Sequence, residues 1–371
     1  MHRVLLLGAG KIGRMIARLL VDSGDYAVTV GDVSQDALDR IASRIPGIEV
    51  RRVDVGSAAS LAEALDGADS VVSALSYFLN PSVAEAALAA GVSYFDLTED
   101  VETTRRVRET AGKAADGQIF MPQCGLAPGF ISIVAQHLTK QFEKLDAVRM
   151  RVGALPLFPT GALKYNLTWS TDGLINEYCN PCEAIHDGRR VELLPLEGYE
   201  QFLLDGARYE AFNTSGGLGT LAATLEGHVR ELNYKTIRYV GHCTEMKLLT
   251  SELRLAERRG VLKDILEQAI PATFQDIVVT FCTVTGWRNG QLVQITDGRK
   301  VYHHDVGGQH WSAIQITTAA SICAVLDLFV AGRLPRRGFV RQEQVDFDAF
   351  IANRFGRFYD EPTSERLHEE P

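Results

Sequence analysis

A strand, a glycine-rich loop and a helix follow one another at the start of this chain. Residues 3–7 form an apolar run typical of a buried strand, residues 8–13 read Gly-Ala-Gly-Lys-Ile-Gly, and residues 14–20 carry apolar side chains at helical spacing. A second apolar run, 27–31, ends at Asp32. In a G-x-G-x-x-G loop the glycines permit a tight turn, close approach of a pyrophosphate and close packing of helix on strand. This order predicts a Rossmann unit that binds a dinucleotide.

The acidic residue after the second strand indicates which dinucleotide is bound. Asp32 is placed to accept hydrogen bonds from the adenosine ribose, and its carboxylate would repel a 2′-phosphate. No arginine occurs in residues 33–35 to hold such a phosphate. The predicted cofactor is therefore NAD rather than NADP. The residues expected to bind it here are Gly8, Gly10, Lys11, Ile12, Gly13, Asp32 and Val33.

Composition limits the class of protein. The chain has 371 residues, 46% hydrophobic and 23% charged, as expected of a globular protein with two domains. A formal net charge of −9 without a basic patch argues against nucleic-acid and membrane partners. Residues 319–330 are apolar but shorter than a bilayer span and contain Asp327, so we expect a buried helix. Six cysteines without an export signal predict reduced thiols and a cytoplasmic protein.

Strands and helices alternate through the first third of the chain. Strands are expected at residues 48–53, 70–75, 92–97 and 118–122, and helices at 57–65, 81–90 and 101–115. This alternation predicts an α/β fold with a doubly wound parallel sheet. Ligands of such sheets gather at the carboxyl ends of the strands. Further candidates for cofactor binding are therefore Asp54, Val55, Ser73, Ala74 and Leu75, and Asp96 ends a neighbouring strand.

The pattern changes after a segment rich in glycine and proline, residues 124–129. A helix is expected at 130–142, and alternating runs then predict strands at residues 147–152, 163–169, 277–287, 291–296 and 300–304. Asn289-Gly290 and Asp297-Gly298 predict hairpin turns between the last three. We therefore expect a second α+β domain on a largely antiparallel sheet. The predicted organisation is a Rossmann domain at 1–125, an α+β substrate and dimerisation domain at 126–310, a helical segment at 311–358 that returns to the Rossmann domain, and a frayed tail at 359–371.

Two patterns could indicate metal or redox chemistry. Cys179 and Cys182 form a C-x-x-C, but no second pair exists and the motif does not open a helix after a thioredoxin-like strand. His303 and His304, with Asp305 and His310, could form a metal cluster, but neighbours on a strand point to opposite faces. We therefore predict no metal site.

Polar side chains concentrate in three parts of the second domain, at residues 164–178, 213–217 and 238–245. A substrate with both an amine and a carboxylate requires such a mixture, because acids bind the ammonium and arginine or N–H groups bind the carboxylate. The candidate substrate-binding residues are Lys164, Tyr165, Trp169, Asn176, Thr214 and Arg238.

Four motifs carry a family resemblance: residues 8–13, Cys-Gly-Leu-Ala-Pro-Gly at 124–129, Tyr-Asn-Leu-Thr-Trp-Ser with Gly-Leu-Ile-Asn-Glu-Tyr within 165–178, and Lys-Thr-Ile-Arg-Tyr-Val-Gly-His at 235–242. With them the chain resembles the saccharopine dehydrogenase-like reductases, and within that superfamily it is most similar to L-lysine 6-dehydrogenase. The resemblance implies NAD-dependent oxidation of a C–N bond in an amino acid. An imine forms and is hydrolysed to ammonia and an aldehyde, which for lysine is the 6-semialdehyde that cyclises.

The resemblance leaves the catalytic base and the direction of the reaction open. Candidates for the base are Asp96, Glu177 and His242, and Arg238 and Lys164 are expected to bind the substrate carboxylate. One alternative is reductive condensation of an amine with a carbonyl compound, as in a saccharopine- or carboxynorspermidine-type reductase. Another is a non-catalytic NAD(H) sensor, and a third is a hydroxy-acid or aldehyde dehydrogenase. We expect a homodimer formed through the sheet of the second domain.

Overall fold

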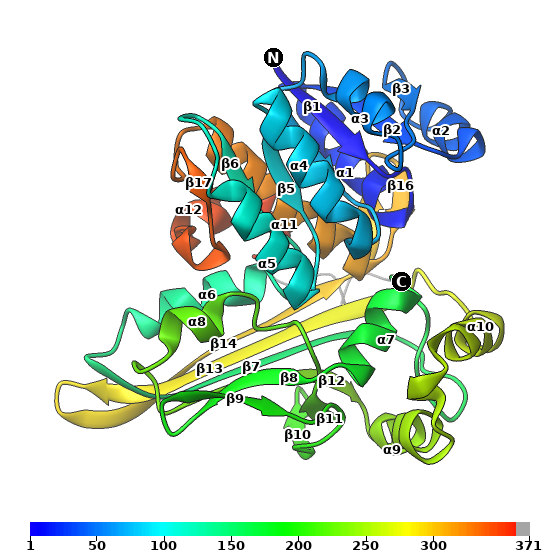
Figure 1. Ribbon diagram of the computed structural model, residues 1–371. Helices are drawn as coiled ribbons and strands as arrows, with labels where there is room; N and C mark the ends of the chain where they lie inside the picture. Colours follow the sequence, from blue (N-terminus) through cyan, green and yellow to red (C-terminus); the bar gives the residue numbers. More distant parts are fainter. Residues whose placement is uncertain (361–371) are drawn as a thin grey trace, which may run out of the picture. The chain divides into compact units, whose positions relative to one another are not determined.

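The computed structural model of the protein describes residues 1–360 (Figure 1). The chain divides into two compact units. The first contains Met1–Phe130 and Gln315–Phe358, so the chain leaves this unit and later returns to it. The second contains Ile131–Ile314 and the two described residues after Phe358, Tyr359 and Asp360.

The first unit is built on a parallel sheet. In spatial order its strands are β17 (Gly338–Phe339), β6 (Ile119–Met121), β5 (Ser93–Asp96), β4 (Ser70–Ser73), β1 (His2–Leu7), β2 (Tyr26–Asp32) and β3 (Glu49–Arg52). All neighbouring pairs run parallel. The strand order reverses at β1, which lies between β4 and β2, and ligands of doubly wound sheets bind at such a point. The predicted Rossmann sheet is confirmed.

Helices connect these strands (Figure 1). They are α1 (Lys11–Ser23), α2 (Gln35–Ala42), α3 (Ala58–Leu65), α4 (Asn80–Ala90), α5 (Val101–Ala111), α11 (Ala313–Val330) and α12 (Phe347–Ala352). Four of them begin at a polar cap, because the side chains of Ser34, Ser57, Asp100 and Asp346 accept hydrogen bonds from the backbone N–H three residues later. Each cap satisfies a donor that the first turn of a helix leaves unpaired.

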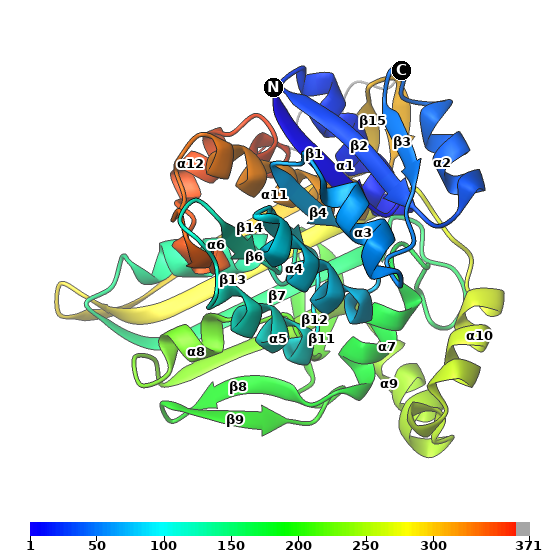
Figure 2. The ribbon, with the colours of Figure 1, turned by 45° about the horizontal axis from the view of Figure 1, so that its top comes forward.

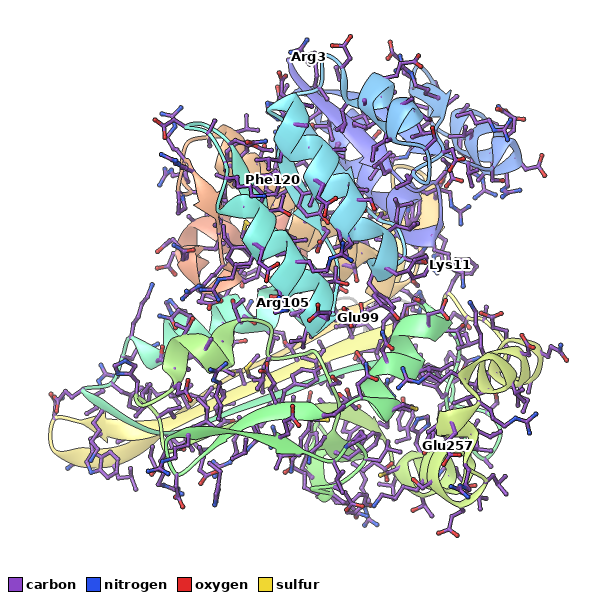
Figure 3. All side chains as sticks on the ribbon, viewed as in Figure 1. Arg3, Lys11, Glu99, Arg105, Phe120 and Glu257 are labelled. Atoms are coloured by element: carbon purple, nitrogen blue, oxygen red, sulfur yellow. The ribbon has the colours of Figure 1, made fainter. Side chains whose placement is uncertain are left out.

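The core of the first unit covers both faces of the sheet. One buried cluster joins the sheet to α3, α4 and α5, and its strand residues include Leu5, Leu7, Val71, Tyr94 and Phe120, the last of which is labelled in Figure 3. Phe95 lies on the opposite face, where its ring centre is 5.6 Å from that of Phe329 in α11. Burial on both faces explains why the strands read as continuous apolar runs rather than as alternating ones.

Helix α11 is longer than the apolar segment predicted from the sequence. By length and composition alone this 18-residue helix could cross a membrane. However, 78% of its residues are buried inside the protein, as in a core helix. Its one acid, Asp327, accepts hydrogen bonds from Tyr26, Asn353 and Arg354. The predicted tail at 359–371 lies outside the described residues, except for its first two.

The second unit is built on a mixed sheet that is largely antiparallel. In spatial order its strands are β10 (Glu200–Leu204), β11 (Ala207–Asn213), β12 (Glu231–Tyr239), β7 (Lys144–Pro156), β13 (Asp276–Arg288) and β14 (Gln291–Tyr302). Strand β8 (Cys182–His186) pairs with β12 and forms a hairpin with β9 (Arg189–Leu193) (Figure 2). Among these pairs only β12 with β7 is parallel. The predicted α+β domain is confirmed.

Shorter elements complete the fold. The helices of the second unit are α6 (Phe130–Thr139), α7 (Thr171–Cys179), α8 (Leu221–Leu225), α9 (His242–Lys247) and α10 (Arg259–Ala269). Strands β15 (His304–Val306) and β16 (Gln309–Trp311) form a separate hairpin. Single turns of 3₁₀ or π helix lie at Tyr77–Leu79, Leu248–Glu252, Leu255–Glu257, Gln342–Gln344 and Gly356–Tyr359.

Two predicted features of the second domain are wrong. Residues 163–169 are irregular rather than a strand, because the Leu167 N–H donates to the carbonyl of Pro271 in an irregular segment instead of to a neighbouring strand. Asp297-Gly298 does not turn but lies within β14, where a Cβ at Gly298 would be 3.3 Å from the Phe281 ring. The turn at Asn289-Gly290 is confirmed, with positive φ angles of 52° and 74°, as a two-residue type I′ hairpin requires.

The contact between α1 and β1 leads to a prediction. A Cβ on Gly13 would lie 1.9 Å from the Gly8 carbonyl oxygen, whereas a Cβ on Gly260 in α10 would have no described atom within 4 Å. We expect Gly13→Ala to lower the free energy of unfolding by more than about 2 kcal/mol. The matched Gly260→Ala should leave it unchanged or raise it by up to about 1 kcal/mol. Urea denaturation measures both, and equal effects would contradict this account of the packing.

Candidate functional site

The glycine loop of the first unit is packed on one side and open on the other. Cβ atoms on Gly8 and Gly13 would clash with the Ala74 carbonyl at 2.8 Å and the Gly8 carbonyl at 1.9 Å. A Cβ on Gly10 would meet none of the described atoms within 4 Å. Gly10 also caps α1 without a side-chain hydrogen bond, and the first turn contains no acid. The free N–H groups of this turn therefore suit a pyrophosphate, which is what a dinucleotide would place there.

Asp32 is held against the same loop. Its Oδ2 accepts a hydrogen bond from the Ala9 N–H at 2.7 Å, and its Oδ1 accepts one from the Ser34 N–H at 2.9 Å. The carboxylate is therefore fixed beside the glycines, and its role in binding the adenosine ribose stays a prediction. Val33 follows it and is 58% exposed.

The end of β4 lies beside the loop, as predicted. The Ala74 N–H donates to the Leu7 carbonyl at 2.8 Å, and the Leu75 side chain would lie 3.4 Å from a Cβ on Gly8. Ser73 instead turns to Asn80, to which its hydroxyl donates at 2.7 Å. Asp54 accepts the Gly56 N–H in a local turn, and the neighbouring Val55 packs on the core.

Sequence reasoning missed a residue that holds the loop from a distant part of the chain. Gln315, in α11, donates from Nε2 to the carbonyl of Lys11 at 3.1 Å and is 1% exposed. Lys11 itself is exposed at the start of α1 (Figure 3). Because Gln315 lies three hundred residues away in an apolar helix, no local pattern in the sequence indicates this contact.

Asp96 lies at the end of β5 and is inaccessible to solvent. Its Oδ2 accepts from the Tyr94 hydroxyl at 2.6 Å, and its Oδ1 accepts from the backbone N–H groups of Thr98 and Gln123, both at 2.9 Å. Burial raises the pKa of Asp96 to about 6, and these hydrogen bonds oppose the shift. In this arrangement Asp96 holds two loops together, and its predicted catalytic role stays a prediction.

The second unit contains a buried cation, Arg238, near the end of β12. Its side chain is 3% exposed, and its guanidinium carbon lies 4.9 Å from the ring centre of Tyr165 and 5.8 Å from that of Tyr178. Nε donates to the Tyr178 hydroxyl at 2.8 Å and Nη1 to the Ile237 carbonyl at 2.9 Å. Within residues 1–360 no carboxylate forms an ion pair with it. Stacking on aromatic faces stabilises the cation but does not neutralise it.

His242 completes a hydrogen-bond chain with Arg238. Its Nδ1 lies 2.7 Å from the Leu163 carbonyl, which can only accept, so Nδ1 carries the proton. Its Nε2 therefore accepts from the Tyr178 hydroxyl, at 3.0 Å. Burial first, and the charge of Arg238 second, lower the pKa of His242 to about 3. The imidazole is neutral with both nitrogens engaged, which favours a positioning role; its predicted role as a base stays a prediction.

The other predicted residues of the second unit lie in different surroundings. Trp169 donates to the Tyr165 hydroxyl at 3.1 Å, so it belongs with Arg238. Asn176 accepts from Arg259 at 3.1 Å, and its buried Nδ2 has no partner among the described residues. Exposed Lys164 donates to the Val240 carbonyl at 2.7 Å, and Thr214 pairs with Thr236 at 2.7 Å.

Glu177 and Tyr178 are neighbours in α7. Glu177 is 7% exposed. Burial is the largest influence on the pKa values of Tyr165, Tyr178 and Arg238, and the negative charge of Glu177 raises all three. Its carboxylate therefore belongs to the same buried cluster. Tyr178 was missed as a site residue, although the polar motif at 165–178 contains it.

Comparison with known proteins gives the class and then the family. Residues 4–121 match the saccharopine dehydrogenase NADP binding domain, and residues 125–357 match the saccharopine dehydrogenase C-terminal domain. With the Rossmann sheet and the open glycine loop, these matches define an NAD(P)-dependent oxidoreductase. The chain belongs to the saccharopine dehydrogenase family. NAD and NADP are not distinguished by these matches.

Individual relatives are more distant. The chain is 23% identical over 259 residues to the mitochondrial alpha-aminoadipic semialdehyde synthase of Rattus norvegicus, covering 62% of this chain and 27% of the relative. It is 24% identical over 313 residues to that of Bos taurus, covering 76% and 31%. The chain thus spans about a third of these relatives or less. Its fold is similar to saccharopine dehydrogenase (L-Glu forming) from Saccharomyces cerevisiae, with a TM-score of 0.75, 17% identity, and coverage of 94% of this chain and 96% of the other.

The position of Asp32 predicts cofactor preference. We expect Asp32→Asn, which keeps an acceptor but removes the charge, to lower the ratio of the Kd for NADPH to the Kd for NADH by about tenfold, equivalent to 1.4 kcal/mol. Asp22→Asn, at the far end of α1, removes the same charge and should leave the ratio unchanged. Quenching of protein fluorescence by each nucleotide measures both constants. An unchanged ratio in Asp32→Asn would show that another residue discriminates.

The buried carboxyl of Asp96 predicts a pH dependence of stability. Because its pKa rises from 3.8 to about 6 on folding, the native state holds the proton more tightly than the unfolded chain. The protonated carboxyl therefore adds up to about 3 kcal/mol to the free energy of unfolding. This stabilisation is fully present below about pH 4 and is lost as the pH rises through 6. The difference in unfolding free energy between wild type and Asp96→Asn should therefore fall between pH 4 and pH 7 and then level off. Urea denaturation across this range would reject the assignment if the difference stayed constant.

Proposed function

We propose that the protein oxidises the 6-carbon of L-lysine with NAD, releasing ammonia and the 6-semialdehyde, which cyclises. The observation that carries this proposal is Arg238, a buried cation that no carboxylate of the described chain pairs with. A buried charge is costly unless it is paired. The carboxylate of an amino acid would supply the missing anion and can accept two parallel hydrogen bonds from a guanidinium.

The chain's own residues would divide the work between the units. In the first unit, the N–H groups at the start of α1 would hold the pyrophosphate and Asp32 the adenosine ribose. In the second unit, Arg238 would hold the substrate carboxylate. The hydrogen bonds from Arg238 to Tyr178 and from Tyr178 to His242 would keep the guanidinium in place. NAD, when bound, supplies the acceptor for the hydride.

The amine must lose a proton before the C–H bond breaks. Glu177 is our candidate for this base, because its carboxylate acts on the same buried cluster as Arg238. Loss of a hydride from C6 then leaves an iminium ion, and water hydrolyses it to the aldehyde and ammonium, which is the protonated form of ammonia. The protein's contribution is to orient the substrate and to control where the proton goes.

A second candidate function is reductive condensation of an amino acid with a carbonyl compound. Both family matches favour it, because they cover nearly the whole described chain and are named for saccharopine dehydrogenase. The same Arg238 site would then hold one carboxylate of the condensed product.

The experiment that separates these functions measures nicotinamide absorbance with a substrate panel at mildly alkaline pH. NADH formation from NAD and L-lysine alone would support the first function. NAD(P)H oxidation that requires both an amine and a carbonyl compound, or NADH formation from saccharopine but not lysine, would support the second. Tight NADH binding without turnover on any substrate would contradict both and identify a sensor.

If Arg238 binds the substrate carboxylate, its removal should weaken binding of the amino acid but not of NADH. We expect Arg238→Met to raise KM for the amino acid at least about a hundredfold, the value of one or two charged hydrogen bonds, while the Kd for NADH stays unchanged. Thermal melts without substrate check that the variant folds, because Tyr178 and the Ile237 carbonyl lose a buried donor. Arg230→Met, which removes an exposed guanidinium paired with Asp146, is the control and should leave KM unchanged. A normal KM in Arg238→Met would remove Arg238 from the site.

A further inference from the structure

The hairpin β15–β16 brings together residues that the sequence separates. Its turn, Gly307-Gly308, has positive φ at both positions, 57° and 73°, and it places Asp305 directly opposite His310. Because side chains alternate along an extended chain, His303 lies on the same face as Asp305. His304 is directed differently, and its Nδ1 lies 3.0 Å from the Tyr302 carbonyl.

The three side chains form a continuous line of close contacts. Nδ1 of His303 lies 3.0 Å from Nε2 of His310, and Nδ1 of His310 lies 2.8 Å from Oδ1 of Asp305. The Asp305 carboxylate accepts the Nδ1 proton of His310 and so leaves the lone pair on Nε2. That lone pair accepts the hydrogen bond that the Nδ1–H of His303 donates, so a bound cation would replace this proton and His303 would carry its proton on Nε2 instead. In metal sites a ligating histidine commonly donates its other N–H to a carboxylate in this way.

We propose that His303 Nδ1 and His310 Nε2 bind one late first-row divalent cation of the Zn²⁺, Ni²⁺ and Cu²⁺ class. Asp305 would act as the positioning residue that sets the tautomer and ring orientation of His310. Imidazole is a preferred ligand of these ions. Two bonds of about 2.0–2.1 Å at a tetrahedral angle separate the nitrogens by about 3.3 Å, so a small opening of the present 3.0 Å contact suffices.

The surroundings suit such an ion. His303 is half-buried and His310 is exposed, so the remaining positions are open to water. A bound ion would also join the end of β14 to β16.

This proposal revises the expectation of no metal site. His303 contacts His310, whereas His304 contacts the Tyr302 carbonyl, so these two neighbouring histidines do not share an ion. The second ligand comes instead from across the hairpin, because the Gly307-Gly308 turn folds His310 back onto the first strand. Only the register of the hairpin decides this pairing.

A second group on the surface provides the control. One ligand atom each from His186, Asp187 and Glu231 lies within 4.8 Å of the others. However, the Glu231 carboxylate is already shared between His186 at 3.0 Å and Arg230 at 2.9 Å. The arginine would repel a cation at this position, so we expect no binding there.

Calorimetric titration of untagged, metal-free protein with NiCl₂ tests the proposal. Nickel is the probe because thiolates favour softer ions. Wild type should bind one equivalent, His310→Ala and His303→Gln should weaken binding at least tenfold, and Asp305→Asn should weaken it about 10- to 100-fold. His186→Ala should bind as wild type does. Thermal melts without metal check that the variants fold.

Three outcomes would overturn the proposal. They are no nickel binding by wild type, binding by both His310→Ala and His303→Gln that equals wild type, or loss of binding in His186→Ala alone. If Asp305→Asn bound as tightly as wild type, the positioning role of Asp305 would be wrong. Because the titration needs neither substrate nor NAD, its outcome is independent of the proposed function.

Discussion

The first unit depends on the contact between two glycines. Gly13 approaches the Gly8 carbonyl so closely that a Cβ would lie 1.9 Å from it. This contact brings the N-terminus of α1 to the carboxyl end of β1, at the position where the strand order reverses. The remaining features of the cofactor site lie around this contact, since Asp32 accepts from the Ala9 N–H and a Cβ on Gly8 would meet the Ala74 carbonyl.

The second unit is organised electrostatically around Arg238. Its guanidinium is buried against the rings of Tyr165 and Tyr178, and the Tyr178 hydroxyl also donates a hydrogen bond to His242. The same positive charge and the same burial keep that histidine neutral. The neutral histidine adds no second positive charge beside the guanidinium, and the negative charge of Glu177 acts on the same cluster. The aromatic walls and the histidine thus serve one purpose, which is to hold an unpaired cation in place.

Local signals were reliable where the chemistry is local. The glycine loop, the strand ends at Asp32 and Ala74, and the turn at Asn289-Gly290 were all predicted, since each depends on a few consecutive residues. The turn expected at Asp297-Gly298 failed, because the long pairing of β14 with β13 outweighs the preference of two residues. The strand expected at 163–169 failed because side-chain burial there follows packing on α7 and α10 rather than a pleat.

The sequence by itself determined the fold class, the order of the strands and helices along the chain, the family and the cofactor loop, because these depend on periodicity and on residues next to one another. Tertiary structure alone decided that Asp96 and His242 have their acceptor atoms occupied, that Gln315 supports the loop, and that His303 meets His310. Each of these depends on contacts between residues distant along the chain or across a turn. The free energy of such contacts depends on burial and geometry, which no short pattern encodes.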